Sequence, residues 1–218
     1  LSRGCPFDCA FCMERAKRET SWRALGVERA LNEISSLHRF LNLEGWTLYI
    51  ADALFGMKKS WRRDFLQGLA RLKIPVDKFW LLTRIDLVEE EDLQLYGQAN
   101  CGLGFGLESG DPAMLSIIRK SGKLKGYLNR MKELSRSASK HQVPWGANII
   151  CGHPGESPDS LRRSAEYMQK LFIDSGESTG FLSIDPFRFY PGSAIDTERH
   201  FYEARYGSRF YRPEWWQD

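Results

Sequence analysis

The stretch Arg3-Gly4-Cys5-Pro6-Phe7-Asp8-Cys9-Ala10-Phe11-Cys12 places three cysteines in the spacing Cys-x-x-x-Cys-x-x-Cys. A loop this short can turn three thiolates toward one compact metal centre. Thiolate sulfur is the ligand that holds iron–sulfur clusters. In a cluster of four irons, three cysteines leave one iron without a protein ligand, and an open position is typical of a catalytic metal site. The spacing therefore predicts such a cluster on Cys5, Cys9 and Cys12.

Three other interpretations of the cysteines stay open. A structural zinc site usually needs four ligands, and only Cys101, Cys151 or one of the four histidines could add the fourth. A disulfide framework is unfavourable, because five cysteines in 218 residues are sparse and odd in number. The third interpretation is a chance triplet that binds no metal. The spacing favours the open-iron cluster over all three.

The cysteine spacing, with the aromatic Phe11 directly before Cys12, resembles the radical S-adenosylmethionine (SAM) superfamily. The wider run Ser2-Arg3-Gly4-Cys5-Pro6-Phe7 is similar to cobalamin-dependent members and their methylthiotransferase relatives. The resemblance implies a 4Fe–4S cluster whose open iron is chelated by the amino and carboxylate groups of SAM. It implies that Cys5, Cys9 and Cys12 are the catalytic ligands and that Phe11 lies against SAM. The activity it implies is reductive cleavage of SAM to a 5′-deoxyadenosyl radical.

Composition and charge are ordinary for a globular domain, with 42% hydrophobic and 27% charged residues and a net charge of +3. That charge is too small to indicate a nucleic-acid partner. No apolar run approaches the length of a membrane span, and no secretory signal is present. We therefore expect a cytoplasmic protein with no membrane partner.

Strand-like and helix-like patterns alternate along the chain about six times, which predicts an α/β fold with a parallel sheet and outer helices. Six units are too few for an eight-fold barrel. The resemblance implies a partial (β/α)6 TIM-like barrel of the radical SAM type over essentially the whole chain. We expect strands at 46–51, 79–83, 102–107, 147–151 and 181–189, where Pro186 shortens or bends the last one. We expect helices near 27–41, 61–72, 124–138 and 157–172, and further helices that open at Glu89 and at Asp111.

The two ends of the chain suggest a core domain taken from a longer protein. Leu1 is not an initiator methionine, and only four residues precede Cys5, so we expect a truncated first strand. The chain stops in the aromatic run Trp215-Trp216 without a finishing signal. We expect residues 1–218 to be one radical SAM core domain, with a cobalamin-binding domain upstream and a further C-terminal region.

Polar residues follow two of the expected strands, at the ends where parallel α/β folds bind ligands. The resemblance implies that Asp52, where many members carry Gly-Gly-Glu, helps to hold the SAM amino group. Its alternative role is a helix cap or turn residue. Arg84 can clamp a carboxylate in bidentate fashion, which makes it a candidate for binding SAM. The alternative for Arg84 is a salt bridge with Asp86 at the strand end.

The run Gly104-Phe105-Gly106-Leu107-Glu108-Ser109-Gly110 is similar to the family's Gly-x-Glu-Ser segment. The resemblance implies that Glu108 contacts SAM with Ser109 beside it, and that Lys120 faces the SAM side. Glycines let a backbone approach a ligand closely. The alternative for Glu108 is a structural carboxylate at the end of a strand.

The run Ile149-Ile150-Cys151-Gly152-His153-Pro154-Gly155-Glu156 resembles the family's Gly-x-Pro-Gly-Glu segment. The resemblance implies that Ile149 and Gly152 receive the adenine of SAM. His153 is more readily a turn residue than a proton donor or metal ligand, and Glu156 is expected to organise the next helix. Cys151 is a small buried residue or a second reactive thiol.

The resemblance favours methyl transfer to an unactivated carbon or a related rearrangement, with cobalamin as a further cofactor bound mainly by a missing domain. The Tyr190-Pro191-Gly192 turn is a weak signal for the same subgroup. The partners implied are a small-molecule or peptide substrate and an electron donor such as flavodoxin or ferredoxin. Two alternatives stay open, namely a methylthiotransferase or other relative without cobalamin, and a non-catalytic metal-binding scaffold.

Substitution of the cysteines tests the ligand assignment. After anaerobic reconstitution we expect about four irons per chain. Cys5→Ala, Cys9→Ala and Cys12→Ala should each abolish the cluster, whereas Cys101→Ala should retain it as a matched control. Iron content and the visible charge-transfer band measure the outcome. Tight zinc binding in place of iron would contradict the prediction.

Overall fold

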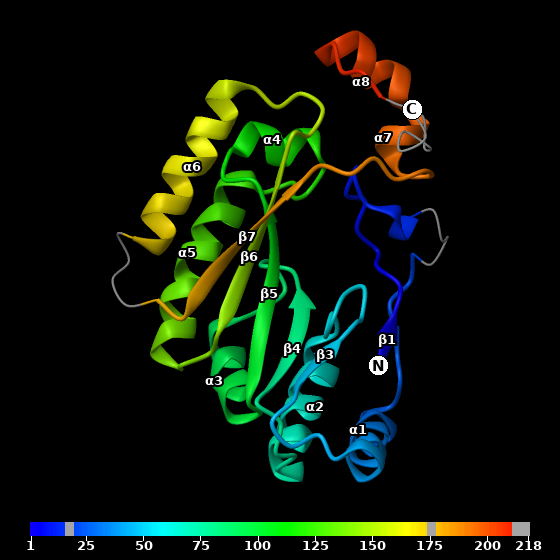
Figure 1. Ribbon diagram of the computed structural model, residues 1–218, viewed down its shortest axis with the longest axis vertical. Helices are drawn as coiled ribbons and strands as arrows, with labels where there is room; N and C mark the ends of the chain where they lie inside the picture. Colours follow the sequence, from blue (N-terminus) through cyan, green and yellow to red (C-terminus); the bar gives the residue numbers. More distant parts are fainter. Residues whose placement is uncertain (16–19, 174–177, 211–218) are drawn as a thin grey trace.

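The computed structural model describes residues 1–15, 20–173 and 178–210, and Figure 1 shows how they are arranged. A parallel five-stranded sheet stands at the centre, with helices on one side and the N-terminal segment facing the other side. The predicted α/β class and partial barrel are confirmed. None of the described helices is both long enough and apolar enough to cross a membrane.

The strands follow one another across the sheet in chain order, β3-β4-β5-β6-β7, and each neighbouring pair is parallel. Parallel neighbours need crossover connections, which the intervening helices supply. All carboxyl-terminal strand ends therefore meet at one rim, where the predicted polar residues lie. The strands are Thr47–Ile50 (β3), Lys78–Thr83 (β4), Cys101–Glu108 (β5), Trp145–Cys151 (β6) and Gly180–Pro186 (β7).

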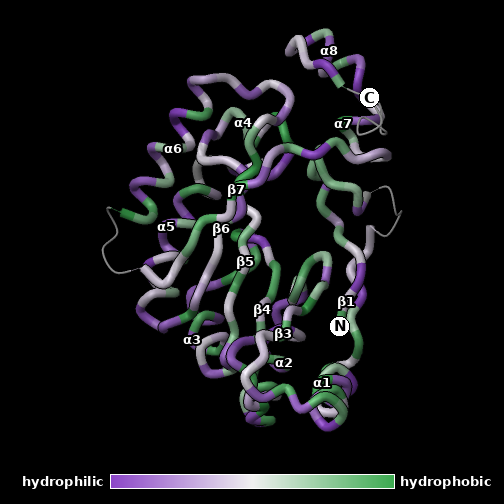
Figure 2. The backbone as a smooth tube through the Cα atoms, viewed as in Figure 1, coloured by the Kyte–Doolittle hydropathy of each residue, from purple (hydrophilic) through white to green (hydrophobic). Residues whose placement is uncertain are grey.

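Apolar side chains of the helices pack against the sheet and form the core, and Figure 2 shows the hydropathy of each residue along the backbone. Phe65 and Leu69 of α2, and Met131 and Leu134 of α5, are almost fully buried. Burying one such side chain stabilises the fold by about 1.5–3 kcal/mol. The helices are Val27–Leu41 (α1), Lys59–Leu72 (α2), Glu90–Gln98 (α3), Pro112–Ile117 (α4), Leu124–Lys140 (α5), Pro158–Phe172 (α6), Ala194–Thr197 (α7) and Arg199–Tyr206 (α8), with a short 3-10 turn at Met13–Arg15.

Glycines take the place of larger residues on the inner face of the sheet along β5 and part of β6. A Cβ atom on Gly102 would lie 2.4 Å from the Trp80 ring, and one on Gly146 would lie 2.7 Å from the Phe181 ring. Only glycine therefore fits beneath these rings, whose centroids are 5.4 Å apart. The two rings lie near the amino-terminal ends of their strands and form an aromatic floor inside the barrel.

The first strand is as short as the sequence predicts. β1 (Ser2–Arg3) pairs antiparallel with β2 (Arg23–Ala24), in a two-stranded sheet separate from the main one. Ser2 donates hydrogen bonds from its backbone N–H (2.9 Å) and its hydroxyl (2.6 Å) to Oδ2 of Asp52, just beyond β3. The truncated strand is therefore fixed beside the edge strand of the main sheet.

The C-terminal part agrees with the prediction at the last strand and departs from it afterwards. The strand expected over 181–189 ends at Pro186, the residue predicted to shorten or bend it, because proline lacks the N–H that would continue the ladder. Two short helices, α7 and α8, then carry the chain over the rim (Figure 1). Neither was predicted, since such short segments hold little periodicity. The run Trp215-Trp216 lies outside the described residues.

A buried ion pair links α2 to α3. Arg62 and Asp92 have side chains that are 1% and 0% exposed, and Nη2 of Arg62 donates to Oδ2 of Asp92. Nε of Arg63 donates to the other carboxylate oxygen at 2.6 Å. Burial alone would raise the pKa of Asp92, but these hydrogen bonds, one from the Glu89 backbone and the nearby positive charges lower it. The ionised carboxylate thus stabilises the packing of both helices.

Removal of this charge tests its contribution. Asp92→Asn should destabilise the fold by about 3–5 kcal/mol in urea unfolding, because it leaves a buried guanidinium unpaired. The exposed neighbour is the control, and Glu91→Gln should change stability by less than about 0.5 kcal/mol. Since the folded pKa of Asp92 lies below the unfolded value of about 3.9, its stabilisation is present above that pH and is lost as the pH falls through the folded pKa. Equal losses in the two variants would contradict the assignment.

Candidate active site

The cysteine loop, residues 5–12, crosses the carboxyl-terminal rim between the end of α4 and the start of α7 (Figure 1). The N–H of Ala10 donates to the Ile118 carbonyl at 2.9 Å, and the Ala10 carbonyl accepts from the Ile195 N–H at 3.0 Å. Ala10 is fully buried beside Ile195 and Tyr202. The loop is therefore clamped on both sides by backbone hydrogen bonds.

All three loop cysteines are free thiols, with Cys9 buried and the other two half-buried. Burial raises the pKa of Cys5 and of Cys12, while backbone hydrogen bonds at Phe7 and Glu14 act in the opposite direction. The Glu14 N–H donates to the Cys12 sulfur at 3.5 Å. Metal binding would replace the thiol protons and use these N–H groups to stabilise thiolate charge.

The donors on the loop are three thiols, and thiolate sulfur is the ligand type that iron–sulfur clusters take. Within residues 1–15, 20–173 and 178–210, no three His, Cys, Asp or Glu side chains gather as the ligands of one metal ion do. The residue types of the clamped loop therefore suit an iron–sulfur cluster.

Arg84 follows β4 and reaches the loop from below. Its Nε and Nη2 each donate to Asp86 at 2.8 Å, and Nη2 also donates to the Lys120 carbonyl at 2.7 Å. Its Nη1 donates to the Cys9 sulfur at 3.6 Å. The Phe7 ring covers the guanidinium, 3.7 Å from its central carbon. The alternative predicted from sequence, a salt bridge with Asp86, is present, and a contact with Cys9 accompanies it.

Glu108 and Lys120 form a buried ion pair beside the loop. Nζ of Lys120 donates to Oε1 of Glu108 at 2.9 Å, and both side chains are below 10% exposed. Burial alone would lower the pKa of Lys120, but the charge of Glu108 raises it. The register against β6 shifts between Gly106 and Glu108, whose φ is +67°. Such a conformation is uncommon for a residue with a side chain and is frequent at functional sites.

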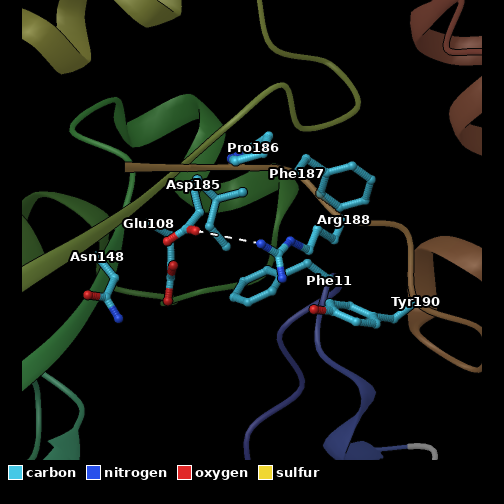
Figure 3. Close-up of a pocket in the computed structure, with 9 residues that line it drawn as sticks. Phe11, Glu108, Asn148, Asp185, Pro186, Phe187, Arg188 and Tyr190 are labelled. Carbon is cyan, nitrogen blue, oxygen red and sulfur yellow. Dashed lines mark ion pairs between the residues drawn. The ribbon is translucent and has the colours of Figure 1, made fainter. Parts of the chain in front are cut away.

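A cavity of about 350 Å³ opens beside this pair, and Figure 3 shows its lining. Aromatic rings and polar groups share its wall, so it suits a ligand with a flat ring and several hydrogen-bonding groups. Asp185 and Arg188 face each other across part of it at 4.0 Å. The lining residues are Phe11, Glu108, Asn148, Ile150, Asp185, Pro186, Phe187, Arg188 and Tyr190.

Of the predicted residues, the structure brings Phe11 and Glu108 together in this wall. It adds Asn148 and Asp185, which sequence reasoning missed. The alternation of side chains along the strands could have identified them. On β6, Asn148 and Ile150 lie on the face opposite to that of the buried Ile149, and on β7, Ser183 and Asp185 share one face. The strand register pairs Asn148 with Ser183 and Ile150 with Asp185.

Two of the predicted residues, Ile149 and Ser109, are not part of the cavity lining. Ile149 is 2% exposed and belongs to the hydrophobic core, because strand alternation turns it away from the neighbours that line the cavity. Ser109 is 1% exposed, and its hydroxyl pairs with that of Ser164 on α6 at 2.9 Å and accepts from the Asp111 N–H. Its role in the structure is to hold the turn after β5.

Asp52 and Gly152 lie at strand ends as predicted. Asp52 is buried, and its Oδ1 accepts from the amino group of Leu1 at 2.8 Å. Gly152 has a φ of +87°, which favours glycine, and its N–H donates to the Glu156 carboxylate. Glu156 therefore fixes the turn that follows β6, whereas the start of α6, which Glu156 was predicted to organise, is capped by Ser157 and Ser160.

His153 and the two remaining cysteines contribute apolar packing. His153 is 3% exposed, with Phe11 at 5.4 Å and Phe187 at 5.2 Å between ring centroids. Neither of its nitrogens has a hydrogen-bond partner in the described part of the chain. Burial lowers its pKa to about 4, so the ring is neutral at pH 7. Burial also raises the pKa of Cys101 and of Cys151, which disfavours a second reactive thiolate.

A family model agrees with this site. The model of the radical SAM superfamily matches residues 1–168, a range that holds the cysteine loop, Arg84 and the Glu108–Lys120 pair. This chain belongs to the radical SAM superfamily. The resemblance seen in the sequence is thus confirmed at the level of the family.

Relatives of this radical SAM chain include methyltransferases. An uncharacterized methyltransferase of Pyrococcus horikoshii is 27% identical over 196 residues, covering 89% of this chain and 40% of that protein. Bacteriochlorophyllide d C-12(1)-methyltransferase of Chlorobaculum tepidum is 23% identical over 217 residues, covering 96% and 45%. The chain spans less than half the length of these relatives.

A solved structure shows the same fold. The radical SAM methyltransferase TsrM of Kitasatospora setae, determined with cobalamin and a [4Fe–4S] cluster bound, superposes with a TM-score of 0.75 at 19% identity. The match covers 89% of this chain and 35% of that one.

The buried, neutral His153 predicts an acid sensitivity of the metal-free chain. Its folded pKa lies below the unfolded value of about 6.5, so the unfolded state binds a proton first and stability falls as the pH drops from about 6.5 toward 4. His153→Phe should flatten this part of the urea-measured pH profile by about 1 kcal/mol per pH unit. The control is His200→Gln, because that side chain is 96% exposed. A variant profile identical to that of the unsubstituted chain would contradict the prediction.

Proposed function

We propose that the chain binds a 4Fe–4S cluster through Cys5, Cys9 and Cys12, and SAM at the iron left without a protein ligand. We further propose that it is the radical-generating core of a cobalamin-dependent C-methyltransferase. One observation carries the proposal, namely that the clamped cysteine loop supplies three free thiols and also Phe11, which lines the same cavity as Glu108.

When bound, a cluster of this kind supplies the electron that cleaves SAM to a 5′-deoxyadenosyl radical. The protein side chains bind and orient the ligand. Glu108, held in place by Lys120, can accept hydrogen bonds from hydroxyl or amino groups in the cavity. Phe11 and Tyr190 offer flat faces to the adenine. We propose that Asp52, which is buried at the end of β3, helps to hold the SAM amino group.

The methyltransferase assignment is supported by the relatives rather than by a residue of this chain. Methyl transfer to an unactivated carbon needs both a radical that removes hydrogen and a methyl donor that meets the carbon radical. We propose that cobalamin, held by a domain outside these 218 residues, provides the methyl group. The partners proposed are a small-molecule or peptide substrate and a cytoplasmic electron donor such as flavodoxin or ferredoxin.

The test is SAM binding and cleavage by the reconstituted, reduced protein. SAM should change the electron paramagnetic resonance (EPR) spectrum of the cluster and yield 5′-deoxyadenosine. Glu108→Gln should weaken SAM binding about ten- to a hundred-fold at unchanged iron content, because it removes a charge-assisted hydrogen bond worth about 1.5–3 kcal/mol. The matched control is Glu133→Gln, an exposed carboxylate on α5.

Further outcomes separate the levels of the proposal. Full iron content without cleavage of SAM would indicate a metal-binding scaffold and would overturn the proposal that the chain is a radical enzyme. Cleavage without corrinoid binding by the full-length protein would overturn only the cobalamin step, and would favour a methylthiotransferase or another relative. A corrinoid absorption spectrum in the full-length protein would support the whole proposal.

A further inference from the structure

The guanidinium of Arg84 connects the cysteine loop to Asp86 and to the backbone of Lys120. It is 5% exposed, and its donors are directed to Asp86, to the Lys120 carbonyl and to the Cys9 sulfur. A planar fork with fixed donors holds these three partners in one geometry. Because most of its donors are already engaged, Arg84 is better placed to act on Cys9 than to clamp a further carboxylate.

The charges around Cys9 are not balanced. The neighbouring cation, Lys120, is neutralised by Glu108 at 2.9 Å, with both side chains below 10% exposed. Asp86, the partner of Arg84, is 36% exposed on its side chain, against 6% for Arg84. Solvent therefore screens the carboxylate more than the guanidinium. The Arg84–Asp86 pair therefore presents a net positive field to the cysteine loop.

Phe7 strengthens this field. It lies between Cys5 and Cys9 in the sequence and covers one face of the guanidinium at 3.7 Å. The ring keeps water from that face, so the charge acts through a medium of lower dielectric constant. Phe7, which lies between two of the cysteines, thus shields the Arg84 guanidinium from solvent on the side of the loop.

We propose that Arg84 is a positioning residue that sets the reduction potential of the cluster, through its hydrogen bond to the Cys9 sulfur and its charge beside it. The inference rests on the proposed function. Reduction adds one negative charge to a cluster, and a nearby cation or a hydrogen bond to a ligand sulfur favours the reduced state. Arg84 therefore makes the cluster easier to reduce.

An EPR-monitored redox titration of the reconstituted protein tests this role. Arg84→Gln should lower the equilibrium constant for reduction about tenfold, which is a shift of 59 mV to more negative potential for one electron. Asp86→Asn should shift the potential in the opposite direction, since it removes the opposing negative charge. Arg130→Gln is the matched control and should leave the potential unchanged, because that arginine binds Val88 and Glu133 instead.

Opposite shifts distinguish an electrostatic role from a structural one, which would give iron loss in both variants. If Arg84→Gln fails to hold iron, Arg84→Lys and Asp86→Asn carry the test. In Arg84→Lys, which keeps the positive charge, the reduction potential should lie close to that of the unsubstituted protein. In Asp86→Asn, the reduction potential should still be higher than that of the unsubstituted protein. Unshifted potentials at full iron content would overturn the inference and leave the proposed function standing. Failure of the unsubstituted chain to hold iron would instead overturn the proposed function.

Discussion

The site depends on two backbone hydrogen bonds at one small residue. Ala10 donates to the end of α4 and accepts from the start of α7, so the cysteine loop cannot move without opening one of these contacts. A buried alanine between Cys9 and Phe11 leaves no side chain to obstruct the approach of both neighbours. This clamp places three thiols and an aromatic ring at the rim where the parallel strands end. The eight residues of the loop are thus brought next to site residues that lie far away in the sequence.

The buried ion pair of Glu108 and Lys120 shows how strain and charge compensate one another. A left-handed conformation at a residue with a side chain costs about 1–3 kcal/mol, and a buried lysine carries its own desolvation cost. Each is tolerable because the other is present. The bulge in β5 turns the carboxylate toward the cation, and the hydrogen bond between them offsets the cost of burying both groups. The pair is therefore a unit, and neither residue has an independent role.

Much of the fold was predictable, because strand and helix periods are local properties of the sequence. The truncated first strand, the five parallel strands and the helices α1 to α6 were all expected within a few residues. The site was predictable only in part. Cys5, Cys9, Cys12 and Glu108 carry their signal in spacing and in flanking glycines, whereas Asn148 and Asp185 reach the cavity through cross-strand register. The burial of Ile149 has the same cause, since one residue of register decides whether a side chain faces core or cavity.

The aromatic floor has a consequence for how the inner face of the sheet can vary in sequence. Trp80 and Phe181 rest on glycine backbone, so the relief of this face is set by two side chains and not by the path of any strand. A smaller side chain at either position would widen the space above the glycines without altering the hydrogen bonds between the strands. The shape of this face and the stability of the sheet can therefore change independently of each other.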